Sequence, residues 1–407
     1  MRKRVLLVNT VAGKGSVGRL VTGLSDSLKE RGAETLIAYG RWEAPAGQNV
    51  YRIGSDIDVG IHGVLSRITD RHGLYSSAAT RALIKKIKEF SPDIIHLHNV
   101  HGYYVNYELL FSWLKNEYAG KEGHRIIWTL HDCWSFTGHC VHFEYAGCER
   151  WRSCCHNCPE KGQYPASLFL DNSKENYRKK QQSFTGIKDL TLVTPSEWLK
   201  EQLKGSFLRE YPVKCVPTGI DLDTFKKRAS SIREKYGIGD KPLLLGAANP
   251  WRERKGFDDF LRLSEALGDK AVIAMIGLKG AEVKRVSAYV NIIPVKRTDS
   301  ISEMAEWYSA SDIYVNLTYE DTFPTTNLEA MACGTPVITY RAGGSPEALT
   351  PECGIVTDVG DIAGVIKAAG ELLKKDTGET ERACRQQAEK YGRAQRFGQY
   401  IDEVYGL

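Results

Sequence analysis

A loop that carries two acids, followed by a short helical segment, is the first place where residue types and spacing could do chemistry. It covers residues 319–337, YEDTFPTTNLEAMACGTPV, directly after the apolar run DIYVNL. Backbone N–H groups at the start of a helix bind anions such as phosphate. Asp321 and Glu329 would repel a phosphate, but their carboxylates can accept hydrogen bonds from sugar hydroxyls. The segment therefore favours a ligand with sugars on either side of a diphosphate.

Glu329 also has a purely structural alternative. Thr326-x-x-Glu329 has the spacing of a capping box, in which the acid binds the backbone at the start of its own helix. The sequence leaves both roles open.

Three glycines in the pattern Gly13-x-Gly15-x-x-Gly18 follow the apolar run VLLVN (5–9) and open a stretch with helical periodicity. Such glycines let a pyrophosphate approach the backbone at a helix start. An NAD site also needs an acid after the second strand, where residues 39–42 read Tyr-Gly-Arg-Trp. We therefore predict that Gly15 and Ser16 meet an anionic ligand other than NAD. A tight turn that needs small residues is the structural alternative.

Six of the ten cysteines lie within 26 residues, and a CxxC pair ends the cluster. Four thiolates suit a tetrahedral structural zinc ion, and in a reducing compartment metal binding is favoured over disulfides. The predicted zinc ligands are Cys140, Cys148, Cys155 and Cys158. Disulfides and free buried cysteines are the alternatives, and Cys154, His142 or His156 could replace one of the four ligands.

Histidines follow two of the predicted strands. His131 comes directly after RIIWTL, and His96, His98 and His101 form an H-x-H-x-x-H pattern. Alternation along a strand places His96 and His98 on one face, but the sequence offers no acid or fourth ligand for a metal there.

The elements that must position these residues alternate between apolar β-rich runs and amphipathic stretches. Near-continuous apolar runs are typical of parallel strands covered by helices on both faces. The first half has them at residues 5–9, 35–39, 93–98, 125–131 and 190–195, and the second half at 242–248, 271–277, 291–295, 312–317 and 336–340. Two such successions predict two doubly wound α/β domains with ligands at the carboxyl ends of their strands.

The predicted boundary between the domains lies near VPTGIDLDTF (216–225). We expect a first domain over 1–217 with a Cys-rich insertion at 132–182, a second over 218–390, and a C-terminal helix over 391–407 that crosses back to the first. The helical stretch 379–405 is expected to break around Gly392.

Composition is that of a globular chain, with 42% hydrophobic and 26% charged residues. No apolar run reaches the ~18 residues of a membrane span, and no export signal is expected, so we predict a cytoplasmic protein. Residues 1–217 carry 30 Lys and Arg against 22 Asp and Glu, a net +8. This basic half suits peripheral contact with the inner face of the cytoplasmic membrane, and ordinary solubilising charge is the alternative.

The segment 319–337 resembles the E-x7-E signature of retaining glycosyltransferases of family 4, and EAMACGTPV is especially typical of it. The resemblance extends over nearly the whole chain and is strongest at 242–347. It implies the GT-B fold, with two Rossmann-like domains facing across a cleft. This chain departs from the signature, because the residue eight positions before Glu329 is Asp321 and not Glu.

The resemblance also implies roles for single residues. Glu329 would bind the nucleotide ribose and Asp321 a donor-sugar hydroxyl, with Glu320 as its possible substitute. Lys255, in the Lys255-Gly256 pair, would hold the diphosphate together with Arg254 or Arg252, and His131 would face the donor sugar. The backbone of the intervening loop would cradle the phosphates, at Thr322, Phe323, Pro324, Thr325 and Thr326.

Taken together, the family resemblance implies a hexosyltransferase that acts on a nucleoside-diphosphate sugar such as a UDP or GDP conjugate. The acceptor would be a saccharide or lipid-linked saccharide, and no catalytic metal would be needed. The HDCW…CxxCP block resembles a subgroup that assembles capsule or exopolysaccharide of the colanic-acid type. Two alternatives stay open: a GT-B sugar-nucleotide epimerase, and a nucleic-acid-binding protein that uses the Cys cluster. The second explains nothing about residues 218–407, so no nucleic acid partner is expected.

Overall fold

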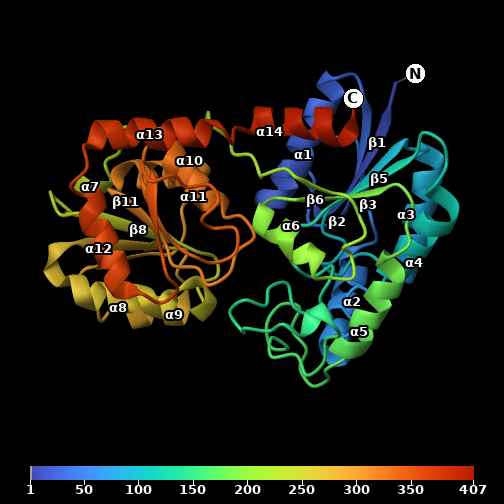
Figure 1. The fold of residues 1–407 in the computed structure, drawn as a ribbon, viewed down its shortest axis with the longest axis horizontal. Helices are drawn as coiled ribbons and strands as arrows, with labels where there is room; N and C mark the ends of the chain where they lie inside the picture. The colour runs from blue at the N-terminus through green and yellow to red at the C-terminus, as the bar shows by residue number, and fades with distance from the viewer. Residues whose placement is uncertain (1) are drawn as a thin grey trace. The chain divides into compact units, whose positions relative to one another are not determined.

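The computed structural model describes residues 2–407, and the chain divides into two compact units. The first comprises Met1–Pro217 together with Arg396–Leu407, and the second comprises Thr218–Gln395. Each unit is a parallel β-sheet with helices packed on its faces (Figure 1). No helix within the described residues is both long and apolar enough to cross a membrane.

The first unit has a sheet of seven strands in the order β3-β2-β1-β4-β5-β6-β7, and every neighbouring pair is parallel. The strands are β1 (Arg4–Val11), β2 (Glu34–Arg41), β3 (Val50–Arg52), β4 (Ile94–Leu97), β5 (Arg125–Thr129), β6 (Leu190–Thr194) and β7 (Val213–Cys215). The helices are α1 (Gly15–Glu30), α2 (Asp56–Thr69), α3 (Ser77–Phe90), α4 (Tyr107–Trp113), α5 (Ser173–Phe184) and α6 (Glu197–Lys204), with a π-helical turn at Leu114–Tyr118.

Alternate residues of β1 serve two different cores, because successive strand side chains point to opposite faces. Val5 and Leu7 pack with α1 and the C-terminal segment, whereas Leu6 and Val8 pack with the core that contains α3, α4 and α5. All four side chains are fully buried. This two-sided burial explains why the strand is a continuous apolar run.

The C-terminal segment belongs to the first unit through buried polar contacts. α14 (Arg393–Gln399) continues into a π-helical turn, Tyr400–Tyr405, after a break that follows α13 at Glu389. The Arg125 guanidinium donates to the carbonyls of Val404 and Tyr405. The Tyr405 hydroxyl lies 2.5 Å from His96 Nδ1, so a strand residue and the last turn share one buried hydrogen bond.

The second unit repeats the plan with six parallel strands in the order β10-β9-β8-β11-β12-β13. They are β8 (Leu243–Ala247), β9 (Val272–Ile276), β10 (Ile292–Val295), β11 (Ile313–Asn316), β12 (Val337–Tyr340) and β13 (Gly354–Thr357). The helices are α7 (Ile232–Lys235), α8 (Phe257–Leu267), α9 (Gly280–Val286), α10 (Ile301–Ala310), α11 (Thr325–Ala332), α12 (Ile362–Leu372) and α13 (Thr377–Glu389).

The structure differs from the sequence expectations in two respects. The short strands β3, β7 and β13 were not expected, because three or four partly buried residues give too little apolar signal. The predicted insertion, 132–182, is irregular only as far as 172, apart from a 3-10 turn at Arg150–Arg152, since α5 begins at Ser173. Charge hides this helix in the sequence, although Tyr177, Lys180 and Phe184 are all buried.

We predict that Tyr405→Phe lowers the free energy of unfolding of the first unit by about 1–3 kcal/mol. The substitution keeps the buried ring but leaves His96 Nδ1 without its hydroxyl partner. Chemical denaturation measures the change. Tyr236→Phe, at a tyrosine that is 37% exposed, is the matched control. Equal stability of the two variants would contradict the proposed contribution of the Tyr405–His96 hydrogen bond to the free energy of unfolding.

Candidate active site

The acidic loop of the second unit follows β11, and α11 begins at Thr325. Pro324 is the N-cap residue, and no side chain caps the helix start. The capping box suggested by Thr326 and Glu329 is therefore wrong. The Glu329 carboxylate instead accepts a hydrogen bond of 3.3 Å from the Tyr308 hydroxyl. Burial, with Glu329 nearby, raises the pKa of Tyr308 well above its usual value, so the phenol keeps the proton that it donates.

Two cations after β8 lie against this loop. Lys255 Nζ is 2.9 Å from Asp321 Oδ2 and 3.2 Å from Thr318 Oγ1, and Arg254 Nη1 is 2.9 Å from Glu320 Oε1. Gly256 follows with φ +73°, and a Cβ there would lie 2.3 Å from the Leu317 carbonyl oxygen. Glycine is needed at this position because it allows the two loops to approach so closely.

The two adjacent acids differ in accessibility. The side chain of Glu320 is 2% exposed and is covered by its pair with Arg254, whereas the Asp321 side chain is 26% exposed. Asp321 Oδ1 also accepts from the Phe323 N–H at 3.2 Å. A ligand can therefore reach Asp321 but not Glu320, which acts as a buried support for Arg254.

The acidic loop is held by a buried asparagine, Asn327, to which the sequence pattern did not point. Asn327 in α11 accepts from the Asn316 side chain at 2.9 Å and donates to the Ser345 carbonyl at 3.2 Å. The Gly344 N–H in turn donates to the Asp321 carbonyl at 2.9 Å. The available signal was a polar residue directly before the run LEAMA (328–332). The segment 343–345 carried none, because only the fold brings it here.

The glycine-rich turn of the first unit lies between β1 and α1. Gly13 has φ +72°, and a Cβ there would lie 2.8 Å from Pro45 Cδ. Gly15 and Ser16 are the first two residues of α1. β2 ends at Arg41, so the strand end that would carry the ribose-binding acid of an NAD site carries a cation.

His131, just after β5, lies among buried histidines. Its Nε2 is 3.1 Å from Nδ1 of His98, and the two rings are stacked. Burial lowers the pKa of His131 to about 4 and holds that of His98 well below its usual value, so both imidazoles are neutral at pH 7. His131 can therefore donate or accept a hydrogen bond, but it does not bring a positive charge.

Asp132 and His101 form a second pair beside His131. Their carboxylate and imidazole are 2.9 Å apart, and His101 Nδ1 is 3.2 Å from the Tyr164 hydroxyl. Burial alone would raise the pKa of Asp132, but the charge and hydrogen bond of His101 lower it to about 2. A small polar pocket lies over these residues, lined by His98, Asn99, His101, His131, Asp132 and Ser135 among others.

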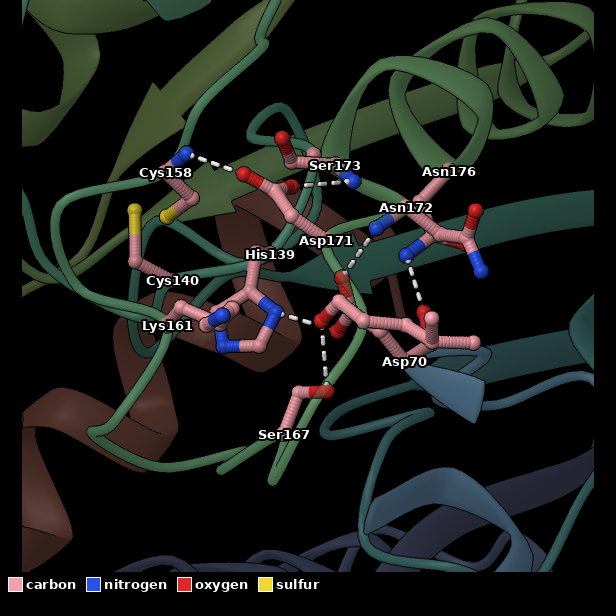
Figure 2. Close-up of polar contacts among 12 residues, drawn as sticks. Asp70, His139, Cys140, Cys158, Lys161, Ser167, Asp171, Asn172, Ser173 and Asn176 are labelled. Carbon is pink, nitrogen blue, oxygen red and sulfur yellow. Dashed lines mark hydrogen bonds and ion pairs between the residues drawn. The ribbon is translucent and has the colours of Figure 1, made fainter. Parts of the chain in front are cut away.

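The expected metal-binding patterns are only partly assembled. His96 contacts the Tyr405 and Thr129 hydroxyls through its two ring nitrogens, so neither is free for a metal. Cys140 and Cys158 share a thiol hydrogen bond, and their sulfurs lie side by side in Figure 2. Cys155 Sγ accepts from the Gly138 N–H. Across residues 2–407, no three His, Cys, Asp or Glu side chains are arranged to hold a metal ion, and zinc binding stays a prediction.

The predicted donor residues thus form two groups. The first group lies in the second unit around the ends of β8 and β11, and it consists of Arg254, Lys255, Glu320, Asp321, residues 322–326 and Glu329. Gly15, Ser16 and His131 follow β1 and β5 in the first unit. The chemistry of the first group fits an anion flanked by hydroxyl groups.

Comparisons with known sequences agree with this chemistry. Residues 17–224, just over half of the 407, match the family described as Glycosyltransferase Family 4, and residues 229–391 match Glycosyl transferases group 1. WcaC of Escherichia coli K12, provisionally named a colanic acid biosynthesis glycosyl transferase, is 26% identical over 267 residues. That match covers 63% of this chain and 62% of WcaC, less than two thirds of its length. The D-inositol 3-phosphate glycosyltransferase of Corynebacterium jeikeium is 24% identical over 326 residues, 75% of this chain and 72% of that protein.

Solved structures share the fold. Sucrose-phosphate synthase from Thermosynechococcus elongatus superposes with a TM-score of 0.72 at 16% identity, with both chains fully covered. Anabaena HepE in complex with UDP and glucose gives a TM-score of 0.65 at 14% identity, again over all of both chains. At such low identity the likeness concerns the fold alone.

The buried histidines predict a pH-dependent stability. Burial lowers the pKa of His62 and His131 to about 4 and that of His96 to about 3, against 6.5 in the unfolded chain. Below pH 6.5 the unfolded chain binds protons that the folded chain does not, so stability falls as pH falls. Each histidine contributes a slope of up to about 1.4 kcal/mol per pH unit.

Denaturation of the first unit between about pH 7 and about pH 5 measures this slope. His131→Asn should reduce it by one histidine's share. Ser135→Ala, a buried substitution beside the same pocket without a titrating group, should leave it unchanged. A stability that does not change over this range would contradict the prediction.

Proposed function

The chain belongs to glycosyltransferase family 4 and has its GT-B fold, and on this basis we propose that it is a retaining hexosyltransferase. It moves a sugar from a nucleoside-diphosphate sugar to a hydroxyl of a saccharide or lipid-linked saccharide. The observation that carries the proposal is the loop after β11, where an accessible acid holds a lysine beside an uncapped helix start.

On this proposal the diphosphate lies between Lys255, Arg254 and the first N–H groups of α11. The contact with Asp321 fixes the Lys255 ammonium at the loop before a donor arrives, so little side-chain freedom is lost on binding. As the glycosidic bond breaks, negative charge grows on the diphosphate. Cations and helix amides already in place stabilise that charge.

Two acids then bind hydroxyls at either end of the donor. Glu329, oriented by Tyr308, accepts from the ribose, and Asp321 accepts from the transferred sugar. The shorter Asp321 side chain takes the place of the family's Glu. Because Glu320 is buried against Arg254, it does not substitute for Asp321.

The proposed reaction retains configuration without a covalent intermediate. The acceptor hydroxyl attacks on the face from which the diphosphate leaves, and a phosphate oxygen takes its proton. The enzyme contributes positioning and support of the leaving group and of the positively charged sugar. His131, neutral at pH 7, offers a hydrogen bond to the donor sugar, and the mechanism uses no catalytic metal.

We place the reaction in polysaccharide assembly, because the similarity to WcaC and the Cys-rich segment both favour that setting. A sugar-nucleotide epimerase is the second candidate, since such enzymes share the GT-B fold. The two differ in one observable: an epimerase converts its sugar nucleotide without any acceptor, whereas a transferase releases nucleoside diphosphate when an acceptor is supplied.

We predict that one nucleoside diphosphate stabilises the protein in a thermal-shift panel of UDP, GDP, ADP, CMP and NAD with their sugar conjugates. Lys255→Ala should weaken binding of that nucleotide about 10- to 100-fold, because a hydrogen bond to a charged group contributes about 1.5–3 kcal/mol. Glu329→Gln should raise the donor KM. Lys367→Ala, at a side chain that is 81% exposed, is the control and should bind like the wild type.

Two results would contradict the proposal. Stabilisation by NAD alone would return the glycine-rich turn to a dinucleotide role. Conversion of the sugar nucleotide with no acceptor present would favour the epimerase.

A further inference from the structure

Helix α2 carries apolar side chains on its exposed face, the reverse of the usual arrangement in a surface helix. Four of its apolar side chains, Ile57, Ile61, Val64 and Ile68, recur at one-face spacing and are 74%, 55%, 57% and 45% exposed, whereas Val59 packs against the core. The side chains that it buries are the polar His62 and Ser66. A helix at the surface of a globular protein normally places its apolar stripe on the core. In α2 that stripe faces outward.

The loop before α5 extends this surface. Leu168, Phe169 and Leu170 are consecutive and 61%, 73% and 50% exposed. They lie next to α2, because the Leu168 N–H donates to the Arg67 carbonyl at 2.8 Å. We call the seven residues together the apolar face: Ile57, Ile61, Val64, Ile68, Leu168, Phe169 and Leu170.

A buried polar hub keeps the loop against the helix (Figure 2). The Asp70 carboxylate at the end of α2 is 2.5 Å from His139 Nδ1, and both side chains are almost fully buried. The same carboxylate accepts from the Asn172 N–H at 2.7 Å, and the Asp70 carbonyl accepts from the Asn176 side chain. The bonds to Asn172 and Asn176 fix the backbone after residues 168–170, and the Leu168 N–H bond to Arg67 fixes it at their start. The apolar side chains are thus held outward and do not fold back onto the core.

Cations border the apolar face. Lys161 Nζ donates to the Phe169 carbonyl, and Arg67, Arg71 and Lys174 are exposed beside the helix and the loop. Asp56 is paired with Arg52. The carboxylate of Asp58 accepts hydrogen bonds from Ser55, and that of Asp171 accepts them from the N–H groups of Cys158 and Ser173. The edge of the face thus presents the exposed cations Arg67, Arg71 and Lys174, and residues 1–217 as a whole carry a net +8.

We propose that the apolar face docks onto a membrane surface with anionic headgroups. Its side chains would enter the boundary between headgroups and acyl chains, and the bordering cations would contact the lipid phosphates. The proposal extends the proposed function by giving the enzyme a means to reach a lipid-linked acceptor. It depends on the surface alone and not on the identity of the donor.

The charge distribution favours lipid over a second copy of the chain. In a two-fold dimer the same patch meets itself, so Arg67 and Arg71 of one copy would approach the same cations of the other. Anionic headgroups neutralise these charges. Three consecutive apolar side chains at a loop also suit insertion into a fluid medium, which needs no matching cavity.

The test is flotation of the full-length protein, without donor or acceptor, on vesicles of phosphatidylethanolamine with phosphatidylglycerol and on vesicles of phosphatidylcholine. We expect binding to the anionic vesicles that weakens with added salt. Ile61→Ser combined with Phe169→Ser should weaken it at least about tenfold, or about 1.4 kcal/mol. Arg71→Gln combined with Lys174→Gln should remove much of the salt dependence. Val290→Ser, at a fully exposed apolar residue of the second unit, is the matched control.

Circular dichroism and the thermal shift with nucleotide show whether each variant is folded, and light scattering gives the oligomeric state. The proposal is overturned if the wild type floats with neither vesicle, or if the Ile61 and Phe169 variant floats like the wild type. It is also overturned if the wild type is a dimer that does not bind lipid, and if the Ile61 and Phe169 variant is a monomer. If the wild-type protein floats with anionic vesicles but transfers no sugar, the result counts against the proposed function and not against the lipid-docking face.

Discussion

Each sheet of this protein consists only of parallel strands, and this constraint decides where chemistry can occur. Parallel neighbours are joined by crossovers, so the carboxyl ends of all strands in a sheet lie along one edge. In the second unit this edge carries Lys255 after β8 and Asp321 after β11, 66 residues apart in the chain. In the first unit it carries the turn after β1 and His131 after β5. The topology thus brings together groups that the sequence keeps far apart.

The charged groups at the second unit's edge are organised in pairs of unequal burial. Arg254 covers the buried Glu320, whereas Lys255 and Asp321 are both about one quarter exposed. A buried acid fixes its cation but has no access to a ligand. The exposed pair can exchange its mutual contact for contacts with a phosphate and a sugar hydroxyl. Glu320 therefore only supports Arg254, whereas Lys255 and Asp321 are both accessible to a ligand, a distinction that residue types alone do not carry.

The sequence predicted the features that depend on local pattern. All ten apolar runs are strands, the terminal helical stretch breaks before Arg393, and the predicted family and fold are confirmed. It did not predict features set by tertiary contact. The capping box failed because Pro324, not Thr326, precedes α11, and α5 was missed because its buried face includes a lysine. The support of Asp321 by residues 343–345 could not be foreseen, since no local pattern links the two segments.

The irregular segment between β5 and α5 connects two properties of the first unit. It contains His131 and Asp132 beside the polar pocket, and it supplies His139, whose side chain contacts Asp70, the C-cap residue of α2. Burial opposes a charge on His139, but the Asp70 carboxylate outweighs burial and raises the pKa of His139. The hub therefore gains from a protonated His139 at low pH and loses that contribution as pH rises through the raised pKa, opposite in sign to the histidines beside β4 and β5. The same segment thus joins the candidate sugar contact to the outward-facing helix, although no strand or long helix runs through it.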